Sequence, residues 1–162
     1  MDAYAKIMGD HEVGRWFPKG DGYTREEAKR SLDAILKHWD KNGFGIWAVT
    51  DEEKKVLLGR CGLNLIAETS EVEVDFVIVR NCWGRGYATE AAKASLAYGF
   101  GILKLDRIIA LAKPENIASR RVIEKIGMQY MKSAEYWGIT CTYYDISKAK
   151  YIRMYPHNRL SM

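Results

Sequence analysis

The feature that most constrains the fold is an alternating stretch that leads directly into a glycine-containing turn. Over residues 71–79, apolar side chains occupy every second position and Glu71, Glu73 and Asp75 stand between them. This pattern predicts a strand with one buried face. The chain then passes through Trp83-Gly84-Arg85-Gly86-Tyr87-Ala88-Thr89-Glu90 into a mostly apolar segment, which predicts a helix from about residue 89 to 103.

Such a turn can bind a phosphate group. Backbone amides converge at a strand-to-helix turn, and the helix N-terminus adds partial positive charge. Glycines at positions 84 and 86 let the chain approach an anion without an intervening Cβ atom. A dinucleotide fingerprint starting at Gly84 would need a small apolar residue where Thr89 stands, and a P-loop would need a Gly-Lys-Ser/Thr sequence that is absent. If the Gly-x-Gly sequence stood alone, an ordinary strand-to-helix connection would be the alternative to a phosphate-binding site.

The remaining segments predict a layered α/β domain. Thr24 and Glu27 form a capping box at the start of a helix over Thr24–Lys41, which ends at Asn42-Gly43. Further strands are predicted over 44–49, 56–66, 107–112, 131–136 and 139–144, and a helix over 117–126. The predicted order along the chain is a helix, three strands, a helix, a strand, a helix and two strands. This order indicates a mixed sheet flanked by helices. We expect one domain over residues 1–162, with a basic, irregular and partly mobile tail over 147–162.

Composition narrows the class of protein. The chain is 48% apolar and 28% charged, which is typical of a globular domain. A net charge of +4 is too small to indicate nucleic-acid binding, although it suits an anionic cofactor. Cys61, Cys82 and Cys141 have no paired or metal-ligand spacing, so we expect no metal site and a reducing, cytoplasmic location. No apolar run approaches the ~20 residues of a membrane span.

Two motifs in a fixed order carry a resemblance to a known family. They are Glu73-Val74-Asp75-Phe76 followed by the 83–91 turn, and Pro114-Glu115-Asn116-Ile117-Ala118-Ser119-Arg120-Arg121 with the residues up to Met128. From about residue 24 to 144 the chain resembles the GNAT superfamily of acetyl-CoA-dependent N-acetyltransferases, in particular the branch of ribosomal-protein N-terminal alanine and serine acetyltransferases. The resemblance implies a mixed, mostly antiparallel central sheet flanked by helices, and acetyl transfer to a primary amine.

The resemblance also implies roles for individual residues. The turn amides of Arg85, Gly86, Tyr87, Ala88 and Thr89 would bind the pyrophosphate of acetyl-CoA. The strand backbone at Val77, Ile78 and Val79 would pair with the pantetheine arm, and Asn116 would bind the same arm. Asn116 is equally a candidate helix cap. Arg120 and Arg121 would neutralise nucleotide phosphates, or they are solvated helix charges. Trp83 stands where many members have Gln or Arg.

The N-terminus departs from the family pattern. Family members usually begin with a strand before the first helix, whereas this sequence starts at Met1-Asp2-Ala3-Tyr4, which we expect to lie within that helix. Either the start is trimmed or the first strand is missing. A homodimer is common in the branch, and the sequence itself does not indicate an oligomeric state.

Direct transfer requires a general base and a donor for the leaving thiolate. We rank Glu73 and Glu135 nearly level as the base, with Asp75 third. Ser119 matches a family serine near the sulfur, where its hydroxyl would stabilise the thiolate. The amide near Ile78 would stabilise the oxyanion. For any single carboxylate, a solvated strand face is the alternative.

The sequence does not identify the amine that accepts the acetyl group. Trp16, Phe17, Tyr23, Tyr136 and Trp137 are candidates for an acceptor pocket, or they cap the core. A protein N-terminus, an amino-acid derivative, a polyamine and an antibiotic all fit the sequence. Two other functions are a non-catalytic acyl-CoA sensor and, with less support, RNA binding through Lys148, Lys150, Arg153 and Arg159.

Overall fold

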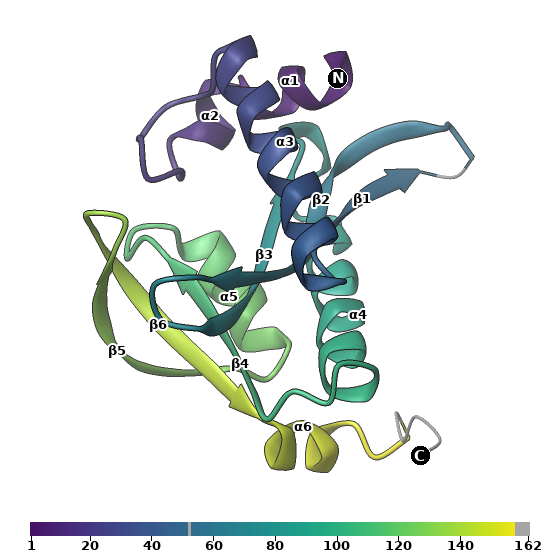
Figure 1. Cartoon of the computed structure of the whole chain (residues 1–162), viewed down its shortest axis with the longest axis vertical. Helices are drawn as coiled ribbons and strands as arrows, with labels where there is room; N and C mark the ends of the chain where they lie inside the picture. Colours follow the sequence, from purple (N-terminus) through teal and green to yellow (C-terminus); the bar gives the residue numbers. More distant parts are fainter. Residues whose placement is uncertain (52, 158–162) are drawn as a thin grey trace.

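A six-stranded sheet forms the centre of the molecule in the computed structural model, which describes residues 1–51 and 53–157 (Figure 1). The strand order is β1-β2-β3-β4-β6-β5. The strands are β1 Ile46–Asp51, β2 Val56–Ile66, β3 Glu71–Ile78, β4 Arg107–Ala112, β5 Gln129–Tyr136 and β6 Ile139–Ser147. Only β3 and β4 pair in parallel; the other neighbours are antiparallel. The expected mixed, mostly antiparallel α/β sheet is therefore confirmed.

Helices cover both faces of this sheet (Figure 1). They are α1 Asp2–Met8, α2 His11–Gly14, α3 Arg25–Asn42, α4 Tyr87–Gly101, α5 Ile117–Lys125 and α6 Lys148–Met154, with a short 3-10 turn, η1, at Arg80–Cys82. One core cluster contains Leu96 of α4, Ile123 of α5 and Val74 of β3. On the opposite face, Met8 of α1 and Ala28 of α3 pack with Val77 of β3. The alternation in β3 thus decides which residues face each layer.

Helix α3 begins and ends as its sequence predicts. The Thr24 hydroxyl accepts a hydrogen bond from the Glu27 amide, and the Glu27 carboxylate accepts one from the Thr24 amide, so the capping box is confirmed. Gly43 follows the last turn in the left-handed conformation, with φ of 72°, which glycine adopts at little cost. Both ends of helix α3 are therefore set by residues next to them in the sequence.

Strands β3 and β4 separate along their length. Their parallel ladder is recorded only at Glu73 and Ile109. Beyond this point β3 continues to Ile78 and β4 to Ala112, while each strand remains paired with its other neighbour. The splayed strands leave one edge of β3 without a neighbouring strand, and this gap positions the site described below.

The C-terminal region differs from the expected irregular tail. Ser147 ends β6 and caps α6 by accepting a hydrogen bond from the Lys150 amide. Tyr151 lies in the core with 4% of its surface exposed and stacks on Phe100 at 4.7 Å between ring centroids. The prediction was wrong for residues 147–154 because this tertiary contact stabilises a helix too short to form alone. Arg159 and the rest of 158–162 lie outside the described residues. In 1–51 and 53–157, no helix combines the length and apolar character needed to cross a membrane.

Candidate active site

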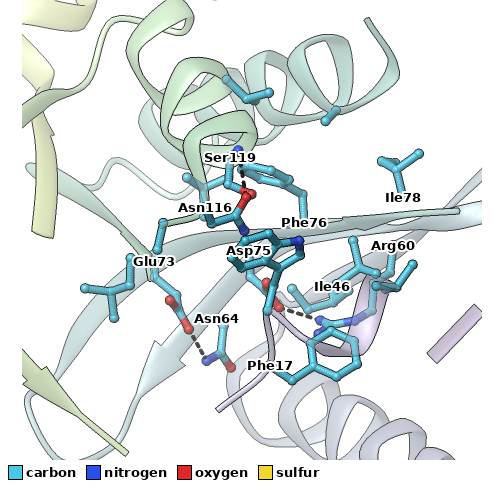
Figure 2. Close-up of a pocket in the computed structure, with 18 of the residues that line it drawn as sticks. Phe17, Ile46, Arg60, Asn64, Glu73, Asp75, Phe76, Ile78, Asn116 and Ser119 are labelled. Atoms are coloured by element: carbon cyan, nitrogen blue, oxygen red, sulfur yellow. Dashed lines mark hydrogen bonds and ion pairs between the residues drawn. The ribbon is translucent and has the colours of Figure 1, made fainter. Parts of the chain in front are cut away.

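A cleft of about 1080 Å³ lies where β3 and β4 separate. Residues 73–78 of β3 form one wall, and Leu111 and Ala112 of β4, with Asn116 and Ser119 beyond them, form the other. The 83–89 turn lies at one end, and side chains from residues 13–38 cover the other. Figure 2 shows Glu73, Asp75, Asn116 and Ser119 around this cleft.

The turn that enters α4 has the geometry of an anion site. Gly84 and Gly86 have φ of 72° and 87°, and a Cβ atom at either position would meet only open space. The Glu90 amide donates to the Gly86 carbonyl, and no side chain caps the helix. The preceding amides of the first turn therefore lack intrahelical acceptors and point out of the helix N-terminus. The open backbone fits a pyrophosphate group.

The free edge of β3 continues this surface toward the sheet. The Val79 amide donates to the Leu58 carbonyl of β2 at 2.7 Å. Because successive amides of a strand point to opposite sides, the amides of Phe76 and Ile78 point toward the cleft. The Ile78 carbonyl accepts a hydrogen bond from the Trp83 indole nitrogen at 2.7 Å. The Ile78 amide is thus an available donor at the cleft edge.

Helix α5 supplies polar groups from the opposite wall. The Asn116 side chain is buried and caps the helix by accepting from the Ser119 amide at 3.2 Å. Ser119 and Arg121 line the cleft. Arg120 instead donates to the Tyr144 hydroxyl and the Pro114 carbonyl, so it fixes the helix against β6 rather than facing the cleft. Arg121 is therefore the better placed of the two arginines for an anionic ligand.

Glu73 is a buried carboxyl group that lines the cleft. Only 6% of the residue is exposed, and Oε1 accepts a hydrogen bond from Asn64 Nδ2 at 3.1 Å. Burial, reinforced by the nearby charge of Asp75, raises the pKa of Glu73 to about 8. A carboxyl group with a pKa close to neutral can exchange a proton efficiently with a bound ligand.

The structure brings most of the predicted site residues together. Cleft-lining residues from the prediction are Glu73, Asp75, Val77, Ile78, Gly86, Tyr87, Ala88, Thr89, Asn116, Ser119 and Arg121, with Trp16, Phe17, Tyr23 and Trp137.

Other predicted residues do not line the cleft. Val79 pairs with β2, and the Arg85 guanidinium lies over the Tyr87 ring, 5.4 Å from its centroid. Glu135 is exposed and accepts a hydrogen bond from Thr140 at 2.6 Å. Tyr136 donates to Glu71.

Sequence reasoning missed polar residues on β2. Arg60 forms an ion pair with Asp75 at 2.5 Å, and Asn64 binds Glu73. Both line the cleft beside α3. The available signal was an Arg and an Asn within the otherwise apolar strand 56–66, because strong polar groups in a buried strand need a partner. No group of metal-ligating side chains occurs among residues 1–51 and 53–157.

Comparison with known proteins places this fold in a family. Residues 1–129 match the family described as an acetyltransferase (GNAT) domain. Bacillus subtilis YnaD, named as an uncharacterized N-acetyltransferase, is 36% identical over 127 residues, which cover 78% of this chain and 72% of YnaD. The chain spans just under two thirds, 64%, of another Bacillus subtilis relative.

Solved structures agree with the family match. A GNAT-family acetyltransferase from Bacillus anthracis has a TM-score of 0.75 and 29% identity, covering 91% of this chain and 89% of that one. The ribosomal-protein-S5-alanine acetyltransferase of Vibrio fischeri shares the fold with a TM-score of 0.71 at 18% identity, covering 91% and 88%. The resemblance seen in the turn and in the 114–128 segment is thus confirmed, and the chain belongs to the GNAT acetyltransferase family.

Proposed function

We propose that the protein transfers the acetyl group of acetyl-CoA to a primary amine by direct attack within a ternary complex. The observation that carries this proposal is the presence of two features in one cleft: an open anion-binding turn at one end and the buried carboxyl group of Glu73 toward the other. A binding module would need only the first feature.

The chain's residues can hold the cofactor along the whole cleft. The amides of residues 86–89 would bind the pyrophosphate, and Arg121 would add positive charge beside the nucleotide. The unpaired edge of β3 at Ile78 would pair with the pantetheine arm as an added strand does. Asn116 keeps its Nδ2 for the same arm, since Oδ1 is used for the helix cap.

Acetyl-CoA would supply a thioester carbonyl, and three groups of the chain would act around it. Glu73, in its ionised form, would take a proton from the ammonium of the acceptor, so that the neutral nitrogen can form the C–N bond. The Phe76 amide, which also points toward the cleft and lies nearer to Glu73 along β3, would donate to the carbonyl oxygen as negative charge develops. Ser119 would donate a hydrogen bond to the sulfur as the C–S bond breaks.

We test the proposal by measuring free-thiol release from acetyl-CoA with a panel of amines, and acetyl-CoA binding by calorimetry. Binding with amine-dependent thiol release is expected. Binding without release under every amine would favour the alternative of an acyl-CoA sensor, and absence of binding would contradict the assignment of the turn.

The Gly86→Glu variant tests the turn directly. It should bind acetyl-CoA at least about 100-fold more weakly, because its carboxylate stands against the pyrophosphate. Gly43→Glu is the matched control, since Gly43 has a similar φ of 72° and equally open surroundings but is not a cleft residue. Equal loss of binding in both variants would show that backbone strain, and not the anion site, is the cause.

A further inference from the structure

The end of the cleft beside α3 carries more positive than negative groups. We call it the acceptor end; it contains the lining residues of 13–38, the polar residues of β2 and β3, and Lys113. Its cations are Lys19, Arg30, Arg60 and Lys113, and its carboxyl groups are Glu27, Glu73 and Asp75. Even with every carboxyl group ionised, one positive charge remains. The surplus increases when Glu73 is protonated.

Hydrogen bonds show which of these charges are already neutralised. Lys19 pairs with Glu27 at 2.6 Å, and Arg60 with Asp75 at 2.5 Å. Lys113 donates to the Arg15 carbonyl at 3.0 Å, which fixes its ammonium across the cleft without cancelling its charge. Arg30 has no ion pair within the described part of the chain. A ligand at this end therefore meets two cations that no carboxylate offsets.

Arg60 is placed to bind an oxygen ligand. Its side chain is 16% exposed, one guanidinium nitrogen, Nη1, binds Asp75, and its buried Nε has no partner among the described residues. Figure 2 shows the guanidinium of Arg60 directed to Asp75. Because Nη1 is used and Nε is enclosed, Nη2 is the guanidinium nitrogen that a ligand oxygen could reach, and its charge-assisted hydrogen bond favours an anionic oxygen over a neutral one.

The spacing along β3 sets the size of the acceptor. Glu73 and Asp75 are next neighbours on one face of the strand, about 7 Å apart along the chain direction. Arg60 is held at Asp75, and its charge acts on Glu73 as well, where it opposes the rise in pKa that burial causes. A ligand that spans both groups needs its amine and its anionic group close together.

We infer that the acceptor of the proposed reaction carries a carboxylate beside its amine, as an α-amino acid does, with Arg60 binding the carboxylate while Glu73 takes a proton from the amine. The inference rests on the proposed function and narrows its substrate class. A polyamine would bring additional cations toward Arg30 and Lys113. A protein N-terminus would present a neutral peptide carbonyl where the carboxylate of an amino acid would lie.

The experiment compares each of a set of α-amino acids with its own carboxamide, and includes a short peptide amide and spermidine. Thiol release is measured at saturating acetyl-CoA, and kcat/KM is expressed per concentration of the ammonium form, which is the form that Glu73 would deprotonate. The best amino acid should exceed its carboxamide by at least about tenfold, since the carboxamide loses a charge-assisted hydrogen bond. Equal or better rates with the carboxamide, the peptide amide or spermidine would overturn the inference while leaving acetyl transfer intact. No release with any amine would instead contradict the proposed function.

Two variants locate the effect. Arg60→Lys keeps a cation for Asp75 but loses the second guanidinium nitrogen that would reach the ligand, and should reduce the preference for the amino acid over its carboxamide to within about threefold. Arg30→Gln removes an exposed charge without disturbing an ion pair, and should raise KM for the amino acid but not for the carboxamide. Lys37→Gln is its control, because Lys37 is also exposed on α3 but does not line the cleft. An unchanged preference in folded Arg60→Lys, or equal effects of Arg30→Gln and Lys37→Gln, would contradict the assignment.

Discussion

Burial of Glu73 lowers the stability of the folded protein when the carboxyl group is ionised, and it also gives this group a pKa suited to proton transfer. Its neighbour across the ladder, Asn64, provides one hydrogen bond, but burial and the charge of Asp75 disfavour the ionised form. The protein therefore binds a proton at Glu73 more tightly when folded than when unfolded. Below the unfolded pKa near 4.5 this contribution to stability is fully present, and it is lost as the pH rises through about 8.

Replacing Glu73 with Gln should separate activity from stability. Activity should fall at least about 100-fold, because a general base is removed. In the wild-type protein kcat/KM should rise with pH and level off above about 8, whereas Glu73→Gln should lack this step. Unfolding by urea at pH 9 should show that the variant is at least as stable as the wild type, since no ionised carboxylate is buried.

Glu135→Gln serves as the comparison for Glu73→Gln. Glu135 is exposed and does not line the cleft, so its replacement should leave the pH profile unchanged. A similar loss of activity in both variants, or a pH step that persists in Glu73→Gln, would refute the assignment of Glu73 as the base.

At the scale of elements, a carboxylate ties the β5–β6 hairpin to β3. The Tyr136 hydroxyl of β5 donates to Glu71 at 2.5 Å, and the Tyr143 hydroxyl of β6 donates to the same carboxylate. Burial raises the pKa of Glu71, but these hydrogen bonds outweigh it and the net shift is downward. This bridge holds the hairpin whose Trp137 contributes to the cleft.

Removal of one hydroxyl should loosen the hairpin. Tyr136→Phe should lower the free energy of unfolding by about 1–2 kcal/mol, the value of a hydrogen bond to a charged group that is partly solvated. It should also raise KM for the acceptor more than it lowers kcat, because Trp137 is less well positioned. Tyr130→Phe is the control on the same strand, since its hydroxyl lies 3.4 Å from Ser133 in an exposed contact.

The difference in the free energy of unfolding between the wild type and Tyr136→Phe should depend on pH in a defined direction. Because the pKa of Glu71 is lowered in the folded state, its stabilising contribution is present above the unfolded pKa of 4.5 and is lost as the pH falls through the folded value. The stability gap between wild type and Tyr136→Phe should therefore narrow in acid. A gap that is constant from pH 7 to acid would show that Glu71 is not the relevant partner.

At the scale of the whole molecule, helix α6 packs residues 148–154 against the main core. Tyr151 packs in the cluster that includes Leu96 of α4 and Ile146 of β6, so the helix closes the layer on the face opposite α3. No residue of α6 lines the cleft.

Truncating Tyr151 should affect global stability without acting on the site. Tyr151→Ala should cost about 3–5 kcal/mol, as for other large aromatic side chains removed from a core. Ile152→Ala, on the same helix but 45% exposed, should cost much less. Urea unfolding of both variants measures the difference, and equal costs would contradict the packing of α6.

Local chemistry determined a large part of this structure from the sequence alone. The capping box at Thr24, the alternation over 71–79 and the turn at Gly84 and Gly86 each depend on neighbouring residues, so they were predictable from the order of amino acids. Strand β2 and strand β4 have the bounds expected for them. Helix α4 begins at Tyr87, earlier than expected, because Gly86 in the left-handed conformation already serves as its N-cap.

Tertiary structure decided the properties that depend on distant residues. Glu73 and Glu135 are equivalent in sequence, both lying on strands, and only the packed fold buries one and exposes the other. The splay of β3 from β4, the Arg60–Asp75 pair and the helical fold of residues 148–154 likewise depend on contacts between segments far apart in the chain. The local sequence pattern determines backbone conformation. Burial and charge pairing arise only when separate elements pack together, and burial and charge pairing set the pKa values and binding groups of the cleft.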